Sequence, residues 1–150
     1  TSKMEQTLSI IKPDAIERNL QDKIKDIFIK NNFMIVKEKK VKLEKKDAEQ
    51  FYKVHETKPF YNDLCNYLSS GPVLVMVLKK DNAIAENRKL MGATNPHDAD
   101  PGTIRKEFAL NIQENSVHGS DSEKNAKNEI EFFFTDKEIV GWLKQRKNNN

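Results

Sequence analysis

Cysteine and glycine are scarce in this chain of 150 residues, which contains one Cys and five Gly. The single cysteine, Cys65, rules out an internal disulfide and suits a reducing compartment, so we expect a cytoplasmic protein. No second Cys or nearby His offers it a redox or metal partner, and we expect a small buried hydrophobe. The glycines never follow the spacing G-x-x-x-x-G-K or G-x-G-x-x-G. P-loop and Rossmann phosphate cradles are therefore excluded.

Long apolar runs and a strong charge of one sign are also missing. The sequence has no apolar run of ~20 residues, which excludes a membrane-spanning helix, and residues 1–6 lack the apolar core of a secretory signal. The net charge of +3, from 26 basic and 23 acidic residues, is too balanced to indicate nucleic-acid binding by itself. The length predicts one domain over residues 1–150, with residues 147–150 as a frayed tail.

Apolar patterns predict alternating strands and helices. Residues 7–11 and 71–78 are short apolar runs typical of buried strands, and the second is apolar on both faces, which predicts a central strand. Pro13 suits the first turn of a helix that breaks near Asn19. Phe33, Ile35, Val41 and Leu43 share the parity of one further strand.

Further helices are predicted at residues 47–55, 60–69 and 82–91, and after a long irregular loop at 92–115 with a short helical turn at 104–108. The residues after 122 predict a helix with Ala126, Ile130 and Phe133 on one face, and 136–146 predict a last helix. This order predicts an α+β sandwich, in which helices cover one face of a small, mainly antiparallel sheet.

The segment from Asn115 to Ser122 contains the strongest candidate for chemistry. Its histidine, His118, stands in a turn rich in Gly, Ser and Asp, beside hydroxyls and carboxylates, where an imidazole can act as a nucleophile. The alternative is a purely structural turn in which Ser120 or Ser122 caps the next helix, since Ser120-x-x-Glu123 matches a capping box.

Four sequence blocks together resemble the nucleoside diphosphate kinase family, over residues 7–134. They are Lys12-Pro-Asp-Ala15, Lys58-Pro-Phe60, Thr94-Asn-Pro96 followed by Pro101-Gly-Thr-Ile-Arg105, and Asn115-Ser-Val-His118-Gly-Ser-Asp-Ser122. In its details the sequence is more similar to the bacterial members of this family than to the animal ones. Gln113-Glu114 and Lys106-Glu107 depart from the common pattern, outside the catalytic set.

The resemblance implies a ferredoxin-like βαββαβ core and an activity. His118 would take the γ-phosphate of a nucleoside triphosphate and pass it to a nucleoside diphosphate, with ping-pong kinetics and broad base and sugar tolerance. Mg²⁺ would arrive bound to the nucleotide, because the sequence shows no dedicated metal-ligand cluster. The partners implied are nucleoside di- and triphosphates and further copies of the chain, with a hexamer favoured over a tetramer. Membranes and nucleic acid are not expected as primary partners.

The resemblance also assigns roles to individual residues. Glu129 would orient His118, with Ser120 between or beside them. Lys12 and Arg105 would offset charge on the transferring group, while Arg88 and Thr94 hold the inner phosphates. Asn115 and Lys12 would contact the sugar hydroxyl. The remaining matched positions are Tyr52 and His55 near the phosphates, and Phe60, Leu64 and Ile112 around the base.

Two other functions remain open from the sequence. A ferredoxin-like sheet can bind nucleic acid by stacking bases on strand aromatics, but the predicted strand at 73–78 contains none. A nucleotide-binding scaffold without catalysis is the second alternative, although each matched catalytic position holds the expected residue type.

Overall fold

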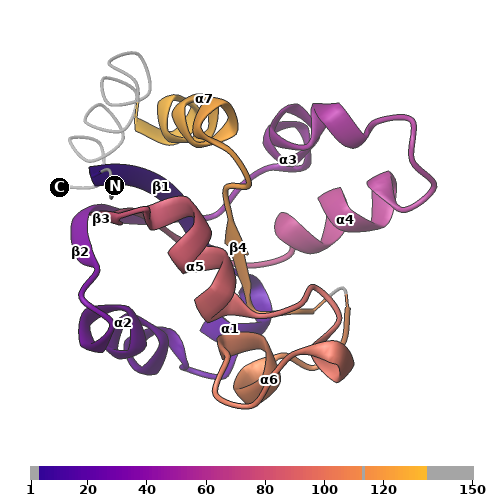
Figure 1. The fold of residues 1–150 in the computed structure, drawn as a ribbon. Coiled ribbons are helices and arrows are strands. Elements are labelled where there is room, and N and C mark those ends of the chain that lie inside the picture. Colours follow the sequence, from indigo (N-terminus) through magenta and orange to yellow (C-terminus); the bar gives the residue numbers. More distant parts are fainter. Residues whose placement is uncertain (1–3, 113, 135–150) are drawn as a thin grey trace, which may run out of the picture.

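The computed structural model describes residues 4–112 and 114–134. Its centre is a four-stranded antiparallel sheet with the strand order β2-β3-β1-β4 (Figure 1). The strands are β1 (Met4–Ile11), β2 (Met34–Val41), β3 (Val73–Asp81) and β4 (Val117–Gly119). The apolar run of β3 lies between two neighbours, as its pattern predicted. The predicted helix at 136–146 and the predicted frayed tail lie outside the described residues.

The helices follow the predicted order, with small differences in their bounds. They are α1 (Pro13–Glu17), α2 (Gln21–Lys30), α3 (Lys45–Phe51), α4 (Tyr61–Leu68), α5 (Ala83–Met91), α6 (Ile104–Phe108) and α7 (Glu123–Phe134), with 3₁₀ turns η1 (Lys53–His55) and η2 (Pro96–Asp98). Pro13 occupies the first turn of α1, and the predicted break before α2 is at Asn19, whose φ is 58°. No helix in the described part of the chain is long and apolar enough to cross a bilayer.

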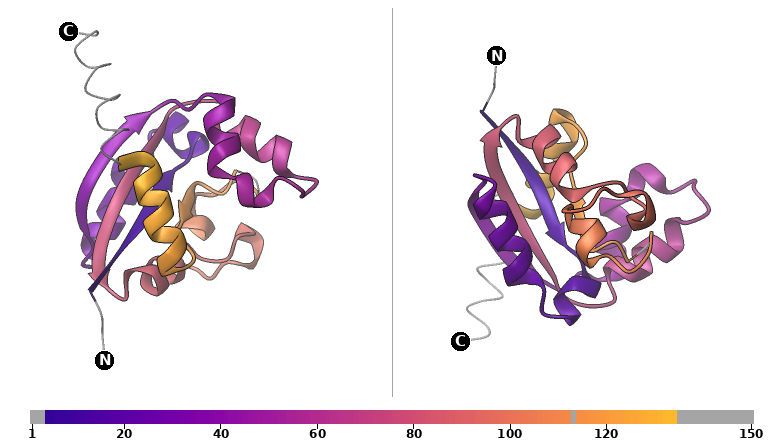
Figure 2. Two further views of the ribbon diagram at one scale, coloured as in Figure 1. Left: turned by 90° about the horizontal axis from the view of Figure 1, so that it is seen from above. Right: turned by 60° about the horizontal axis from the view of Figure 1, so that its bottom comes forward.

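The α+β class and the ferredoxin-like core are confirmed, but the prediction that helices cover only one face of the sheet is wrong. One face packs against α2 and α5 through Ile24, Phe28 and Met91. The other packs against α3, α4 and α7 through Ala48, Leu68 and Phe133 (Figure 2). The inserted pair α3–α4 and the helix α7 present apolar faces of their own, and those faces must be buried.

The strand β2 contains the second departure from the sequence pattern. A β-bulge between Ile35 and Lys37 shifts its register against β3. Because one extra residue reverses the side of the sheet to which all later residues point, Phe33 and Ile35 pack in one core and Val41 and Leu43 in the other. The shared parity predicted for these four residues is therefore wrong.

Candidate active site

The histidine singled out by the sequence lies on a strand, not in a turn. His118 is the middle residue of β4 and pairs with Ile10 of β1, so its imidazole points to the sheet face covered by α3, α4 and α7. The tight turn begins only after Gly119. A strand position fixes the backbone of His118 more firmly than a surface turn does, because β4 is hydrogen-bonded to β1.

A carboxylate from α7 contacts one nitrogen of this ring. His118 Nε2 lies 2.9 Å from Glu129 Oε1, and the Ser120 hydroxyl donates to the same oxygen at 2.8 Å. Leu8 N–H in turn donates to Ser120 Oγ at 3.3 Å. An Nε2–H donor to Glu129 leaves the lone pair of Nδ1 available.

Ser120 therefore does not form the capping box that its spacing with Glu123 suggested. The helix cap is the other predicted serine, Ser122, whose hydroxyl accepts from Asn125 N–H at 3.1 Å. Ser120 is fully buried and its hydroxyl is directed to the carboxylate of Glu129 instead. The two serines thus divide the roles that the sequence left open between them.

Aromatic rings surround the imidazole on its other sides. Phe51, at the end of α3, meets it edge-on with ring centroids 5.4 Å apart, and the Tyr52 ring centroid is 6.4 Å away. Burial, and then the charge of Glu129, raise the pKa of the Tyr52 phenol. Tyr52 was expected near the phosphates, whereas Phe51 was not anticipated; its only signal was an aromatic residue next to a matched one.

The first cationic side chain of the site is Lys12, which directly follows β1. It is 5% exposed, and its Nζ donates to Asn115 Oδ1 at 2.8 Å. Burial and the neighbouring Arg105 lower the pKa of Lys12 from 10.5 to about 7, against the opposing effect of Asp14. The structure thus brings together Lys12 and Asn115, the two residues expected at the sugar hydroxyl.

A second cation, Arg105, comes from α6 inside the long loop. Its guanidinium donates to Gly92 O at 3.0 Å and to Val117 O at 2.9 Å, while its buried Nε has no partner among the described residues. Burial and the charge of Arg88 lower the pKa of Arg105 to about 10. Arg105 therefore lies close enough to both Lys12 and Arg88 for like-charge repulsion, and clustered cations of this kind favour the binding of an anion.

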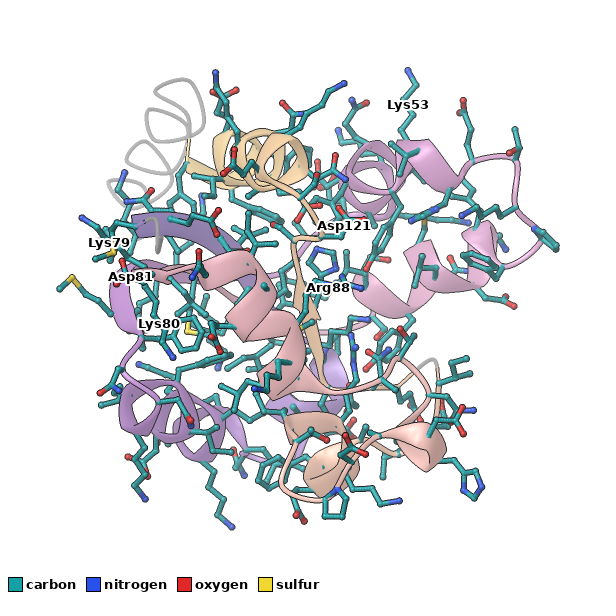
Figure 3. All side chains as sticks on the ribbon, in the orientation of Figure 1. Lys53, Lys79, Lys80, Asp81, Arg88 and Asp121 are labelled. Atoms are coloured by element: carbon teal, nitrogen blue, oxygen red, sulfur yellow. The ribbon has the colours of Figure 1, made fainter. Side chains whose placement is uncertain are left out.

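The outer part of the cation cluster is more open. Arg88 is exposed on α5, and Figure 3 places its side chain near that of Asp121 in the turn after β4. The pKa of Asp121 is lowered first by a hydrogen bond from Asn125 and also by Arg88. Thr94 is exposed, and its carbonyl accepts weakly from Asn115 Nδ2 at 3.5 Å.

His55 occupies a separate position at the edge of the aromatic cluster. The centroid of its ring lies 6.1 Å from that of Tyr52 and 5.9 Å from that of Phe60, and its buried Nδ1 meets no partner in residues 4–112 and 114–134. Burial, followed by the charge of Lys58, lowers the pKa of His55.

Two of the three residues expected at the base are exposed. Phe60, just before α4, is 49% exposed, and Ile112, in the long loop, is 59% exposed. Large exposed apolar side chains commonly mark binding surfaces. Leu64 is half-buried and packs against the core beneath α4, so its side chain also helps to hold α4 in place.

Dedicated metal ligands do not gather in the described part of the chain. No group of three or more His, Cys, Asp or Glu side chains is placed to hold a metal there. Near His118 the carboxylates are Glu129, bound to the ring, and Asp121, bound to Asn125. A Mg²⁺ ion needs near-octahedral oxygen coordination, and each of these two carboxylates already binds a neighbouring side chain.

Comparison with known proteins shows which sequences this chain is similar to. A model of the family described as nucleoside diphosphate kinase matches residues 5–139. The nucleoside diphosphate kinase of Nitratiruptor sp. is 57% identical over 137 residues, covering 91% of this chain and 100% of that protein. That of Campylobacter hominis is 59% identical over 136 residues, with 91% and 99% covered.

Solved structures agree with the sequence comparisons. The nucleoside diphosphate kinase of Aquifex aeolicus superposes with a TM-score of 0.88 at 38% identity, covering 91% of this chain and 99% of that one. The enzyme of Encephalitozoon cuniculi gives a TM-score of 0.85 at 35% identity, with 89% and 90% covered.

Proposed function

The chain belongs to the nucleoside diphosphate kinase family, and we propose that residues 1–150 form one domain that transfers a γ-phosphate between nucleotides through a phosphohistidine on His118. The observation that carries this mechanism is the contact of Glu129 Oε1 with His118 Nε2 at 2.9 Å. With Nε2–H donating to the carboxylate, Nδ1 keeps the electron pair that a nucleophile needs.

The first half-reaction forms a bond between Nδ1 and the γ-phosphorus. The bond from that phosphorus to the β,γ-bridging oxygen breaks, its electron pair stays on the oxygen, and the nucleoside diphosphate leaves. Positive charge that develops on the imidazole is stabilised by Glu129, which retains its hydrogen bond throughout. No proton needs to move, so positioning and charge stabilisation dominate.

The second half-reaction reverses the first with another nucleotide. A terminal oxygen of the acceptor diphosphate attacks the phosphorus, and the electron pair of the N–P bond returns to Nδ1. Because the donor and the acceptor nucleotide occupy the same binding site in turn, ping-pong kinetics follow. Loose contacts to the base through exposed Phe60 and Ile112 support broad tolerance of base.

Cations of the chain neutralise the phosphates. Lys12 and Arg105 act on the transferring group, Arg88 and Thr94 on the inner phosphates, and Asn115 with Lys12 on the sugar hydroxyl. The family requires a divalent cation, which we assign to Mg²⁺ carried by the nucleotide, where it shields phosphate charge. Tyr52 and His55 complete the wall on the side of α3 and η1.

Assembly and location follow from other features. Ile29, Met34 and Val36 are exposed by 57%, 63% and 38% on α2 and the edge strand β2, which supports a homo-oligomer, with a hexamer favoured over a tetramer. A bare sheet face is not the reason for assembly, since helices cover both faces. The buried free thiol of Cys65 supports a cytoplasmic location.

The proposed function is tested by isolating the intermediate. The chain incubated with γ-labelled ATP alone should retain label that is lost in acid and stable in base, and a diphosphate added afterwards should remove it. His118→Ala should retain none. Near-wild-type turnover in His118→Ala contradicts the mechanism.

A further inference from the structure

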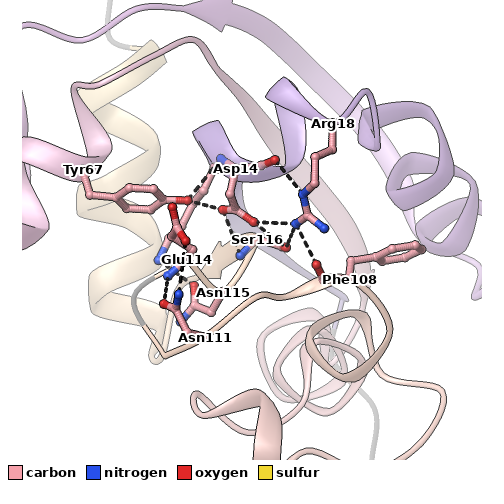
Figure 4. Close-up of polar contacts among 9 residues, drawn as sticks. Asp14, Arg18, Tyr67, Phe108, Asn111, Glu114, Asn115 and Ser116 are labelled. Carbon is pink, nitrogen blue, oxygen red and sulfur yellow. Dashed lines mark hydrogen bonds and ion pairs between the residues drawn. The ribbon is translucent and has the colours of Figure 1, made fainter.

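A buried carboxylate outside the residues assigned above lies behind the site. Asp14 of α1 is 4% exposed, and its side chain accepts from Tyr67 Oη, from Ser116 N–H at 3.3 Å and Ser116 Oγ at 2.9 Å, and from Arg18 Nη2 at 2.9 Å (Figure 4). A buried charge is costly unless its bonds are satisfied, and Asp14 receives donors from three separate parts of the chain.

The donors around Asp14 are themselves held in place. Burial, and then the bond to Asp14, raise the pKa of Tyr67, which keeps its phenol protonated as a donor. Arg18 extends beyond Asp14 and donates to Phe108 O at 2.7 Å, at the end of α6. Asp14 is therefore the common acceptor that joins α1 and α4 to the segment before β4 and, through Arg18, to α6.

Ser116 is the residue that this carboxylate fixes most directly. Its φ is 72°, in the left-handed region that a residue with a side chain rarely adopts without support. Its N–H and hydroxyl both donate to Asp14, and its carbonyl accepts from Lys12 N–H at 2.8 Å. Hydrogen bonds at the N–H, the hydroxyl and the carbonyl of Ser116 thus support its left-handed conformation.

The neighbours of Ser116 are the residues that need this conformation. Asn115, just before it, accepts from Lys12 Nζ, and the carbonyl of Val117, just after it, accepts from Arg105. His118 follows one residue later on β4. A change of φ at Ser116 would therefore displace the Lys12–Asn115 pair relative to the nucleophile.

The charge of Asp14 acts on the same lysine. The charged groups that influence Lys12 are Arg105 of α6, which lowers its pKa in addition to burial, and Asp14, which raises it. The carboxylate thus favours the protonated amine that can neutralise a phosphate. Position and charge at Lys12 both depend on Asp14.

We propose that Asp14 is a positioning residue for phosphoryl transfer, which holds Ser116 left-handed so that Asn115, Lys12 and His118 meet the nucleotide in register. This role rests on the proposed function of the site. It separates Asp14 from a residue that only stabilises the fold, because loss of the carboxylate should change the pH dependence of catalysis as well as its rate.

The test compares Asp14→Asn, which keeps the shape and removes the charge, with Asp26→Asn, the same change at an exposed carboxylate of α2. At equal amounts of folded protein, Asp14→Asn should lower kcat/KM by ~10- to 100-fold. The basic limb of its kcat/KM profile should move to lower pH, since Lys12 then loses its proton more easily. Asp26→Asn should leave both unchanged.

A second variant separates position from charge. In Asp14→Asn/Ser116→Gly, glycine adopts a positive φ without support, so part of the lost kcat/KM should return while the basic limb stays displaced. Where Asp14→Asn fails to fold, Ser116→Ala removes one hydrogen bond to the carboxylate. It should lower kcat/KM while the melting temperature changes little. Unchanged kcat/KM, or a uniform loss with an unmoved limb, overturns the proposal.

A direct titration makes the inference independent of activity. With ¹³C-labelled lysine, the signal that disappears in Lys12→Arg should titrate near 7 in the otherwise unchanged chain and at lower pH in Asp14→Asn. An identical midpoint in both proteins contradicts the role of Asp14 even if the chain proves to have another activity. An inactive wild-type chain with a displaced midpoint contradicts only the proposed function.

Discussion

Glu129 Oε1 lies 2.9 Å from His118 Nε2 and accepts the Ser120 hydroxyl as well. The residues come from β4, the turn after it and α7, so the three groups are joined across a short stretch of chain. Leu8 N–H fixes the serine from β1. The imidazole therefore has one defined orientation before any nucleotide binds, which reduces the reorganisation that the reaction requires.

Glu129→Gln tests this orientation. The amide keeps the size of the side chain but loses the charge that, in the proposed mechanism, stabilises the imidazole as the N–P bond forms, so we expect kcat to fall by ~10- to 100-fold with little change in KM. Steady-state kinetics measure both constants. Glu131→Gln, at an exposed position of the same helix, is the control and should match wild type; an unaffected Glu129→Gln rejects the orienting role.

Phe51→Ala tests the edge-on ring beside His118. Phe51 is half-buried and also contacts Phe132 and Phe133, so unfolding in urea should show a loss of about 3 kcal/mol. Turnover of the folded fraction should fall too, because the imidazole loses a wall. Phe132→Ala is the matched comparison, because it removes from α7 a ring that contacts Phe51. Equal turnover in the two variants argues against a role for Phe51 in catalysis.

Phe60→Ala concerns binding of the base. Because Phe60 is 49% exposed, its loss should leave the melting temperature nearly unchanged and weaken nucleotide binding by ~1–3 kcal/mol, the range for a base–aromatic stack. Calorimetry with adenine and guanine diphosphates should give similar losses. Val54→Ala, at a more exposed apolar residue, is a control. A loss confined to one base contradicts the stacking account.

Lys12→Met reveals the cost of burying a cation. The folded pKa of Lys12, about 7, is below its ordinary value of 10.5, so between these values the unfolded chain binds more protons and stability rises with pH. Below about 7 the penalty is complete. Relative to Lys12→Met, the wild-type chain should therefore gain stability as the pH rises from about 7 to about 10 in urea titrations. The exposed Lys23→Met should give no such difference; a parallel pH profile for Lys12→Met contradicts the lowered pKa.

Met34→Glu tests assembly through the edge strand. The side chain is 63% exposed in the single chain, so a charge there should be tolerated by the fold but not by an apolar contact between copies. Light scattering should give a mass several times 17.4 kDa for wild type and a smaller one for Met34→Glu. Lys30→Glu, an exposed change on α2, is the control. A monomeric, fully active wild-type chain rejects the proposed oligomer.

Patterns within one element were predictable where local chemistry decided the outcome. Pro13 at the first turn of α1 and the apolar run of β3 follow from backbone geometry and burial alone. The bulge after Ile35 did not, since an extra residue is accommodated by the partner strand and not by the sequence around it. One residue was enough to move Val41 to the opposite core.

The site divides in the same way. Motif spacing pointed to His118, Lys12, Arg105 and Asn115, and the family resemblance named Glu129 as the residue that orients His118. Neither indicated that the contact is to Nε2 or that Phe51 lies against the ring. Asp14 stood inside a matched block without a role, although a carboxylate between buried residues was a signal that it needed donors. Arg18 is a near neighbour in sequence, but the donors Tyr67 and Ser116 lie more than fifty positions away, where only the tertiary fold brings them to Asp14.

The pairing of β1 with β4 joins the two ends of the described chain. Leu8 meets Ser120 across 112 positions and Lys12 meets Asn115 across 103. Contacts of such sequence separation close the largest loops and are expected late in folding. During synthesis Lys12 and β1 are therefore present long before Asn115 and β4, and the candidate site is complete only when β4 pairs with β1.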